Sequence, residues 1–321
     1  MSRSCCSDLR RRGSALVLLA GTLCVVSVVS GRPLHAQVRL IEPDAVQASN
    51  LGDSFLTLSA GGCAVRYRSG GLDRAHHVLR RLDLITRQLN EWSAVPVPLA
   101  VYLLDRPGWS DLGMRGVYGV PERTGPNAVA LAAEGDPGTV GLWRELLQAP
   151  AVPLVPGVPL RGTPEEAGTL AIADVLLQIE AARGFVQRAG LLGERAWIGE
   201  VAAHVAALSL FDRHERSRLP EIVALFRRME EATEGHGPFS LESFSPTPGP
   251  ADEAELRRWL WYQARFFGAA RLLIDKHGRK TVARLQKLSG PRGVLGESEL
   301  LAEYDQLREW HRNLGSGFPQ Q

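Results

Sequence analysis

The early part of the chain alternates between short apolar runs and a glycine turn. The runs FLTL (residues 55–58) and CAVRY (residues 63–67) lie on either side of Gly61 and Gly62, and this arrangement predicts a β-hairpin. Apolar residues then recur at spacings of three and four over residues 75–92, as they do on one face of an amphipathic helix. This part of the chain is therefore predicted to form two strands followed by a helix.

Two further apolar runs predict buried strands, and they enclose a long loop. LAVYLL (residues 99–104) and AVAL (residues 128–131) are each long enough for a strand. The segment between them, residues 105–127, carries three glycines at three-residue spacing. It lacks the strand, tight turn and immediate helix of a phosphate-binding loop. We therefore expect a surface loop there.

Proline and glycine mark the change from this mixed region to a helical one. Residues 149–160 (APAVPLVPGVPL) contain four prolines and one glycine. Helical periodicity follows, and predicts helices at residues 164–184, 194–211, 217–233, 252–276, 279–289 and 297–313. The predicted fold class is α+β, with a small mixed β-sheet lobe (37–148), a Pro-rich linker (149–163), a larger helical lobe (164–314) and a disordered tail (315–321).

The first 36 residues have the pattern of a signal peptide. Four arginines within residues 1–12 precede an apolar run over residues 15–29, and Leu34-His35-Ala36 resembles a cleavage site. The run is shorter than the roughly 18 to 20 residues that a membrane span needs. We therefore expect an exported protein, periplasmic or secreted, with no stable membrane span after cleavage. Arg11-Arg12 leaves open whether export is by the Sec or the twin-arginine route.

The composition of the chain after cleavage of the leader argues against nucleic-acid-binding proteins and against disulfide-stabilised ones. Five Arg and one Asp lie in residues 1–36, so the 37 basic and 35 acidic residues of the whole chain become 32 and 34. Such a balance lacks the basic surface of a nucleic-acid-binding protein, and we expect no nucleic-acid partner. Only Cys63 of the four cysteines follows the leader. A disulfide within the mature chain is therefore excluded, and a packed core has to stabilise it.

Polar residues inside two apolar helices form the main candidate site. Within residues 170–179 only Asp174 and Gln178 are polar, and their spacing of four places them on one row of a helix. In the next helix Glu200 and His204 have the same spacing. Two helices that each direct such a pair inward are one way to build a metal site.

The sequence around Glu200 resembles peptidase MA-like domains of the gluzincin type. AWIGEVA (residues 196–202) is similar to the family pattern P-W-L-x-E-G-x-A, whose Glu is the third zinc ligand. YQARF (262–266) and LLIDKHG (272–278) resemble the helical part that follows, and residues 101–104 resemble the first-lobe sheet. The resemblance implies a gluzincin-like fold and a secreted zinc metallopeptidase, in which an HExxH helix supplies two His ligands and the catalytic Glu.

The HExxH motif is missing where the resemblance places it. Aligned by apolar neighbours, residues 173–178 (ADVLLQ) occupy its position. Asp174 then replaces the first His, Val175 the catalytic Glu, and Gln178 the second His. The chemistry needs a carboxylate that takes a proton from zinc-bound water, and Val175 has none. The resemblance therefore implies a degenerate, inactive site with no assigned catalytic residue.

Two arrangements of the four polar side chains remain open. Asp174, Glu200 and His204 can hold a metal ion, with Gln178 as a weak oxygen ligand, and zinc is then the candidate cofactor. In the other arrangement a buried hydrogen-bond network replaces the metal site. The two carboxylates then accept from His204, and from Gln178 or a nearby Arg. We expect the network, and no cofactor.

The resulting functional hypothesis is a noncatalytic binding or scaffold protein of the cell envelope. Its partner is an unknown peptide or protein, held in the cleft between the two lobes. The alternative is a divergent metal-dependent hydrolase or peptidase that uses Asp174, Glu200 and His204. His76 and His77 are expected to be surface or boundary residues.

Overall fold

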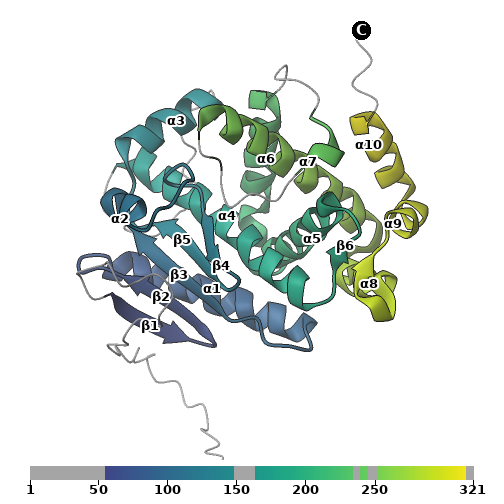
Figure 1. Ribbon diagram of the computed structural model, residues 1–321, viewed down its shortest axis with the longest axis horizontal. Coiled ribbons are helices and arrows are strands. Elements are labelled where there is room, and N and C mark those ends of the chain that lie inside the picture. The colour runs from purple at the N-terminus through teal and green to yellow at the C-terminus, as the bar shows by residue number, and fades with distance from the viewer. Residues whose placement is uncertain (1–54, 148–162, 234–238, 245–249, 251, 316–321) are drawn as a thin grey trace, which may run out of the picture. The chain divides into compact units, whose positions relative to one another are not determined.

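A mixed sheet and a group of long helices make up the computed structural model (Figure 1). It describes residues 55–147, 163–233, 239–244, 250 and 252–315. These residues all belong to one compact unit, Ala36–Gln321. The expected leader (1–36), the expected linker (149–163) except Thr163, and the expected tail (315–321) except Gly315 lie outside the described residues.

The sheet has five strands in the order β1-β2-β3-β5-β4. β1 and β2 form the predicted antiparallel hairpin, β2, β3 and β5 are parallel, and β4 is antiparallel to β5 at the edge. The class is therefore α+β with a small mixed sheet, as the sequence predicts. The strands are β1 (Leu56–Ala60), β2 (Cys63–Tyr67), β3 (Leu99–Leu104), β4 (Glu122–Gly125) and β5 (Ala128–Ala132).

One face of the sheet belongs to the main hydrophobic core. Val65, Val101 and Val129 are direct neighbours across three strands, and each is fully buried. This core also contains the apolar side chains of α1 and α4, so the sheet and the helices that follow it share one core. Each fully buried Val or Leu contributes about 1.5 to 3 kcal/mol to such a core.

Ten helices occur among the described residues, and α4 lies in the middle of them (Figure 1). It contacts α1, α3, α5 and β5, and this explains why its sequence is apolar on nearly every side. The helices are α1 (Leu72–Trp92), α2 (Arg106–Asp111), α3 (Pro137–Leu147), α4 (Pro164–Arg188), α5 (Ala196–His214), α6 (Leu219–Thr233), α7 (Glu253–His277), α8 (Thr281–Ser289), α9 (Glu297–Glu303) and α10 (Asp305–Gly315).

The start of α4 has a sequence-encoded cap. Thr163 Oγ1 accepts a hydrogen bond from the Glu166 amide at 3.2 Å, and Glu166 Oε2 accepts one from the Thr163 amide at 2.7 Å. Pro164 occupies the first helical turn, where its missing N–H costs nothing. This reciprocal capping box fixes the helix start and therefore which residues face each neighbour.

Three features differ from the sequence-based expectation. The predicted loop at 105–127 contains α2 and β4, and α2 begins where Asp105 accepts a hydrogen bond from the Gly108 amide. The region expected to be helical throughout also contains a short parallel pair, β6 (Leu192–Gly193) with β7 (Val294–Leu295). The last predicted helix is divided at Tyr304, whose backbone is extended.

Candidate functional site

Asp174 is bound to α1 and not to α5. Arg74 donates from Nη1 and Nη2 to the two carboxylate oxygens at 2.9 and 2.5 Å, and His77 Nε2 donates at 2.9 Å. Asp174 is 1% exposed and Arg74 is 4% exposed. The expectation that Asp174 faces Glu200 and His204 is therefore wrong. His77 lies at a boundary, as expected, with its side chain 14% exposed, and its ring bonds to this buried carboxylate.

The charge of Asp174 is maintained by these partners. Burial on its own would raise the pKa of the carboxyl group, but the Arg74 guanidinium and the hydrogen bond from His77 outweigh it and hold the pKa well below its usual range. Asp174 is therefore an ionised member of a buried ion pair, and its oxygens are already occupied.

Gln178 connects α4 to α1 and α5. Its Nε2 donates to the carbonyl of Ala207 in α5 at 3.1 Å, and its Oε1 accepts from Arg81 of α1 at 3.3 Å. Val175 lies fully buried among apolar side chains. Gln178 therefore has a hydrogen-bonding role and Val175 a packing role at the positions where the resemblance places HExxH.

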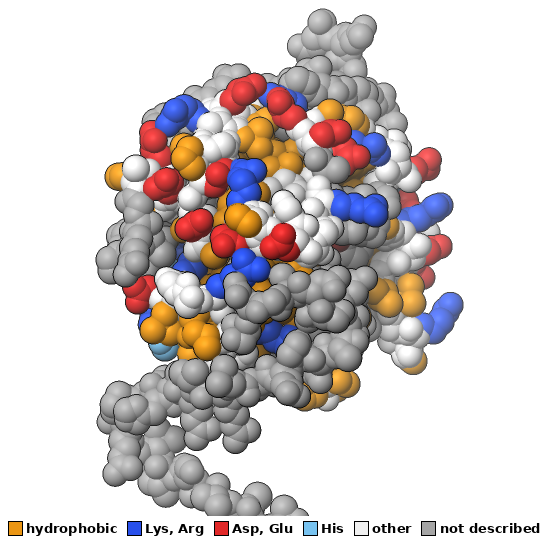
Figure 2. All heavy atoms as spheres, turned by 60° about the vertical axis from the view of Figure 1, so that its left-hand side comes forward, with side chains coloured by type: hydrophobic (Ala, Val, Ile, Leu, Met, Phe, Trp, Pro, Cys, Tyr) orange, Lys and Arg blue, Asp and Glu red, His pale blue; other side chains and the backbone are white. Residues whose placement is uncertain are grey.

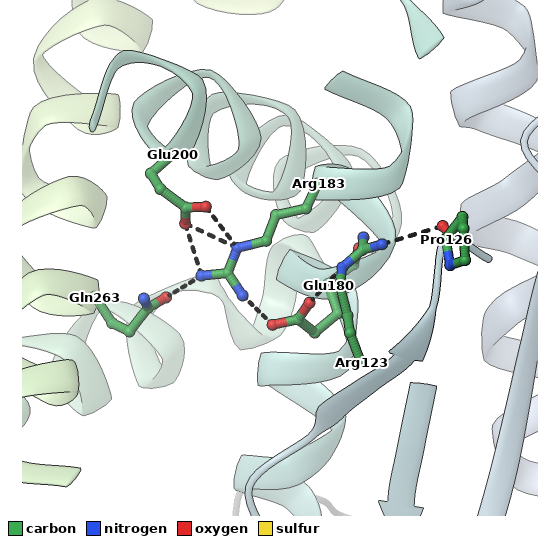
Figure 3. Close-up of polar contacts among 6 residues, drawn as sticks. All are labelled: Arg123, Pro126, Glu180, Arg183, Glu200 and Gln263. Carbon is green, nitrogen blue, oxygen red and sulfur yellow. Dashed lines mark hydrogen bonds and ion pairs between the residues drawn. The ribbon is translucent and has the colours of Figure 1, made fainter. Parts of the chain in front are cut away.

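Glu200 of α5 forms its ion pair with an arginine of α4 that lies outside the predicted set. Arg183 Nε lies 2.9 and 2.8 Å from the two carboxylate oxygens of Glu200, and Nη2 lies 2.6 Å from one of them (Figure 3). The side chains of Arg183 and Glu200 are 15% and 7% exposed. The expectation of a buried network with a nearby Arg is confirmed for Glu200.

Arg183 is the centre of a larger network (Figure 3). Its guanidinium also bonds to the carboxylate of Glu180, one turn earlier on α4, and donates to Gln263 Oε1 of α7 at 3.1 Å. Glu180 receives a second cation, because Arg123 of β4 donates from Nε to the carboxylate at 3.1 Å and from Nη2 to the Glu180 carbonyl at 2.7 Å. The network therefore joins α4, α5 and α7 to the edge of the sheet.

The two positive and two negative charges of this network balance. Burial would lower the pKa of Arg183, but the carboxylates of Glu180 and Glu200 outweigh burial and raise it above its usual range. Arg183 stays charged as a result. Removing one member of such a buried group leaves an uncompensated charge.

His204 does not bond to either carboxylate. Its Nδ1 donates to the backbone carbonyl of Glu200 at 2.9 Å, and the ring lies near Phe226 and Phe266. Its Nε2 has no hydrogen-bond partner among the described residues. Burial lowers the pKa of His204 to about 3 and nearby Arg183 adds to this, so the ring is neutral at physiological pH. The predicted bonds from His204 to Asp174 and Glu200 are therefore wrong.

The side chains around Glu200 do not suit a zinc ion. In the described part of the chain, no three His, Cys, Asp or Glu side chains are grouped so as to hold a metal. Both oxygens of Glu200 already accept hydrogen bonds from Arg183, so a guanidinium supplies the positive charge there. The predicted ligands Asp174, Glu200 and His204 are not brought together, and a zinc ion at Glu200 would lie against a cation.

The residues that face Glu200 were missed because two polar pairs lie on different faces of α4. Asp174 faces α1 and Gln178 bonds to both α1 and α5, whereas Glu180 faces β4 and Arg183 faces Glu200 of α5. One signal was available in the sequence. Glu180 and Arg183 are three residues apart, which is the spacing of an ion pair on one face of a helix. Arg183 also precedes Glu200 by only 17 residues.

Cys63 and Glu215 are explained by local packing. Cys63 is a buried strand residue that shares a hydrogen bond with Thr86 Oγ1 at 3.0 Å, and burial raises the pKa of its thiol. Glu215 follows His214 in the one His-Glu sequence of the chain, and it pairs with Arg81 at 2.7 Å and with Arg218. Neither residue has the surroundings of a nucleophile or a general base.

Comparison of the chain with known proteins adds no information about this site. None of the helices in the described ranges has the length and apolar character needed to cross a membrane. Searches against family models, curated proteins and solved structures found no match for the chain.

Proposed function

We propose that the chain is an exported, noncatalytic relative of the gluzincin metallopeptidases that binds a peptide or protein in the cell envelope. One observation carries the proposal. The Arg183 guanidinium lies between the carboxylates of Glu180 and Glu200, where a metallopeptidase of this type would have a metal ion between a motif helix and the third-ligand Glu.

The pattern of residues on α4 supports a changed register for the lost motif. Residues 179–183 read Ile-Glu-Ala-Ala-Arg, and HExxH has His in the first and fifth places and Glu in the second. Glu180 then keeps the place of the catalytic Glu, while Ile179 and Arg183 replace the two His. Ile179 and Arg183 are four residues apart and share a row of the helix, as the two ligands would.

Arginine at the fifth place makes catalysis unfavourable. A peptidase of this type needs a carboxylate free to take a proton from metal-bound water, but Glu180 accepts from both Arg183 and Arg123. The hydrolase hypothesis based on Asp174, Glu200 and His204 has no support, because these side chains bond to separate partners.

The binding part of the proposal rests on the edge of the sheet. β4 is the last strand in the sheet order, so one side of it has no strand partner among the described residues. Arg123 of this strand reaches Glu180, which places the open edge next to the network. An extended peptide can add to such an edge through main-chain hydrogen bonds.

The test of the metal-site part is to restore the motif. We expect the Ile179→His/Arg183→His double variant to bind about one zinc per chain, because it recreates two His ligands beside Glu200. The wild type should bind none under the same conditions. Adding Glu200→Ala to the double variant should abolish binding. Zinc is measured by inductively coupled plasma mass spectrometry after equilibration with zinc and gel filtration, and circular dichroism checks folding.

Two results would oppose this part of the proposal. One is a folded double variant that binds no zinc. The other is wild-type protein that carries stoichiometric zinc and loses it in Glu200→Ala.

The binding part is tested at β4 with a matched pair of variants. Thr124 lies at the irregular position between Arg123 and Gly125 and has no register partner in β5. Proline has no backbone N–H to donate to an added strand, so Thr124→Pro should remove the binding of fluorescein-labelled casein. Thr124→Ala keeps the N–H and should leave this binding unchanged. Binding is measured for both variants by fluorescence anisotropy. The casein should remain uncut on a gel. Cleavage, or equal binding by both variants, would refute the proposed mode.

A further inference from the structure

A cavity of about 480 Å³ lies beyond the carboxyl ends of β3 and β5. Its walls come from α2, from the segment between α2 and β4, and from the first turns of α3. This is the side of a parallel pair on which ligands are commonly held, and the volume falls within the range of small-molecule sites. Its lining includes Arg106, Trp109, Met114, Val117, Tyr118 and Leu142.

The aromatic wall of the cavity is preformed. Trp109 Nε1 donates to the Gly116 carbonyl at 2.9 Å, and the Tyr118 hydroxyl donates to the Leu104 carbonyl at 3.1 Å. The two rings meet edge to face with centroids 5.4 Å apart. Both side chains are therefore fixed by the protein alone, and a ligand does not have to order them.

Arg106 adds an oriented positive group to this wall. Its Nε donates to Asp136 at 3.1 Å, its Nη2 also contacts Asp136, and its guanidinium carbon lies 5.2 Å from the centre of the Tyr118 ring. These contacts leave Nη1 without an acceptor among the described residues. The lining of the cavity therefore includes a donor that Asp136 holds in place and the apolar side chains of Met114, Val117 and Leu142.

We propose that this cavity binds a small organic acid with an apolar body. Its carboxylate would accept from Arg106 Nη1, and its body would contact Met114, Val117 and Leu142. Asp136 forms an ion pair with Arg106, so the pair has no net charge, and a singly charged carboxylate is favoured over a phosphate. No residue of the cavity belongs to the Arg183 network, and the proposal stands or falls independently of the proposed function.

The surrounding surface agrees with a single-carboxylate ligand. Figure 2 brings forward the side of the molecule that carries α2 and α3, and its acidic and basic side chains are interspersed. A polyanion would need a broad positive field there. Recognition therefore has to come from the one guanidinium and from apolar contact.

Isothermal titration calorimetry with 3-phenylpropionate and its neutral amide tests the proposal. We expect the acid to bind about tenfold more tightly than the amide, because a charge-assisted hydrogen bond is lost in the amide. Arg106→Gln should remove this preference, and Leu142→Trp should abolish binding by filling the cavity. Arg115→Gln, in the exposed part of the neighbouring segment, is the matched control and should change nothing. Circular dichroism checks that each variant folds.

A second pair of probes distinguishes whether the bound carboxylate is the end of a peptide or belongs to a free organic acid. Acetyl-Ala-Ala-Phe with a free carboxyl end that binds more tightly than 3-phenylpropionate would identify a peptide terminus, and weaker or equal binding would identify a free acid. Either result supports the proposal. Absence of binding by all acids, equal binding of acid and amide, or unchanged binding in folded Leu142→Trp would overturn it.

Discussion

Replacing Arg183 by methionine is the sharpest test of the buried network. The substitution keeps an unbranched side chain but removes all the hydrogen bonds that Glu200 accepts. Glu180 retains Arg123 at 3.1 Å, so a single carboxylate loses its partner. That carboxylate is 7% exposed, and breaking a buried pair in this way costs about 3 to 5 kcal/mol.

A loss of this size is a large share of the roughly 5 to 15 kcal/mol that stabilises a typical domain. We would measure it by urea unfolding, followed by circular dichroism at neutral pH, with the slope of the transition compared between variants. The Arg183→Met/Glu200→Met double variant is the control, since it replaces the charged pair by apolar side chains. It should recover at least half of the loss, because no buried charge is left unpaired.

The result that would refute this reasoning is specific. If Arg183→Met lowered the free energy of unfolding by less than about 1 kcal/mol, the pair would behave like an exposed one. If the double variant were as unstable as the single variant, the cost would come from packing around Arg183 and not from the charge of Glu200.

Two further predictions concern single buried groups. Burial lowers the pKa of His204 to about 3 in the folded protein, whereas its pKa in the unfolded chain is about 6.5. As the pH falls below about 6.5, the unfolded chain therefore binds a proton that the folded protein does not. The free energy of unfolding should decrease by about 2 kcal/mol between pH 7 and pH 5. The His204→Asn variant should show a smaller pH dependence by the same unfolding assay, and an unchanged slope would exclude His204 as its origin. The Tyr304 hydroxyl is buried without a hydrogen-bond partner in the described structure, so Tyr304→Phe should change the stability by no more than about 0.5 kcal/mol. Tyr262→Phe, which loses a 2.8 Å bond to the Ser240 carbonyl, should cost about 1 kcal/mol in thermal or urea unfolding, and equal costs would contradict the assignment.

Much of the element order could be predicted from periodicity. The strands at 56–60, 63–67 and 99–104 and the long helix at 72–92 agree closely with the predicted segments. β4 was not predicted because its residues, Glu-Arg-Thr-Gly, contain no apolar run, and α2 was not predicted because six residues are too few to establish a helical period. The same reason applies to the two-residue strands β6 and β7.

The candidate site was predicted less well, and the reason lies in α4. A helix that is apolar on all sides gives no stripe from which to decide which polar residue faces which neighbour. Asp174 was therefore assigned to α5, although its partner Arg74 lies 100 residues earlier in the chain. Such distant pairing leaves no local signal. On α1, Arg74, His77 and Arg81 have the spacing of a solvent-facing row, but they face α4.

The arrangement around Arg183 determines where the positive charge between Glu180 and Glu200 comes from when the protein folds. A metal ion has to be acquired from the surroundings, and it can be withdrawn by a chelator or exchanged for another metal. A guanidinium is covalently part of the chain and keeps its proton at any physiological pH. The cation between Glu180 and Glu200 is therefore present from the moment of synthesis, in equal number with the chain, whatever the metal supply of the compartment in which the protein folds.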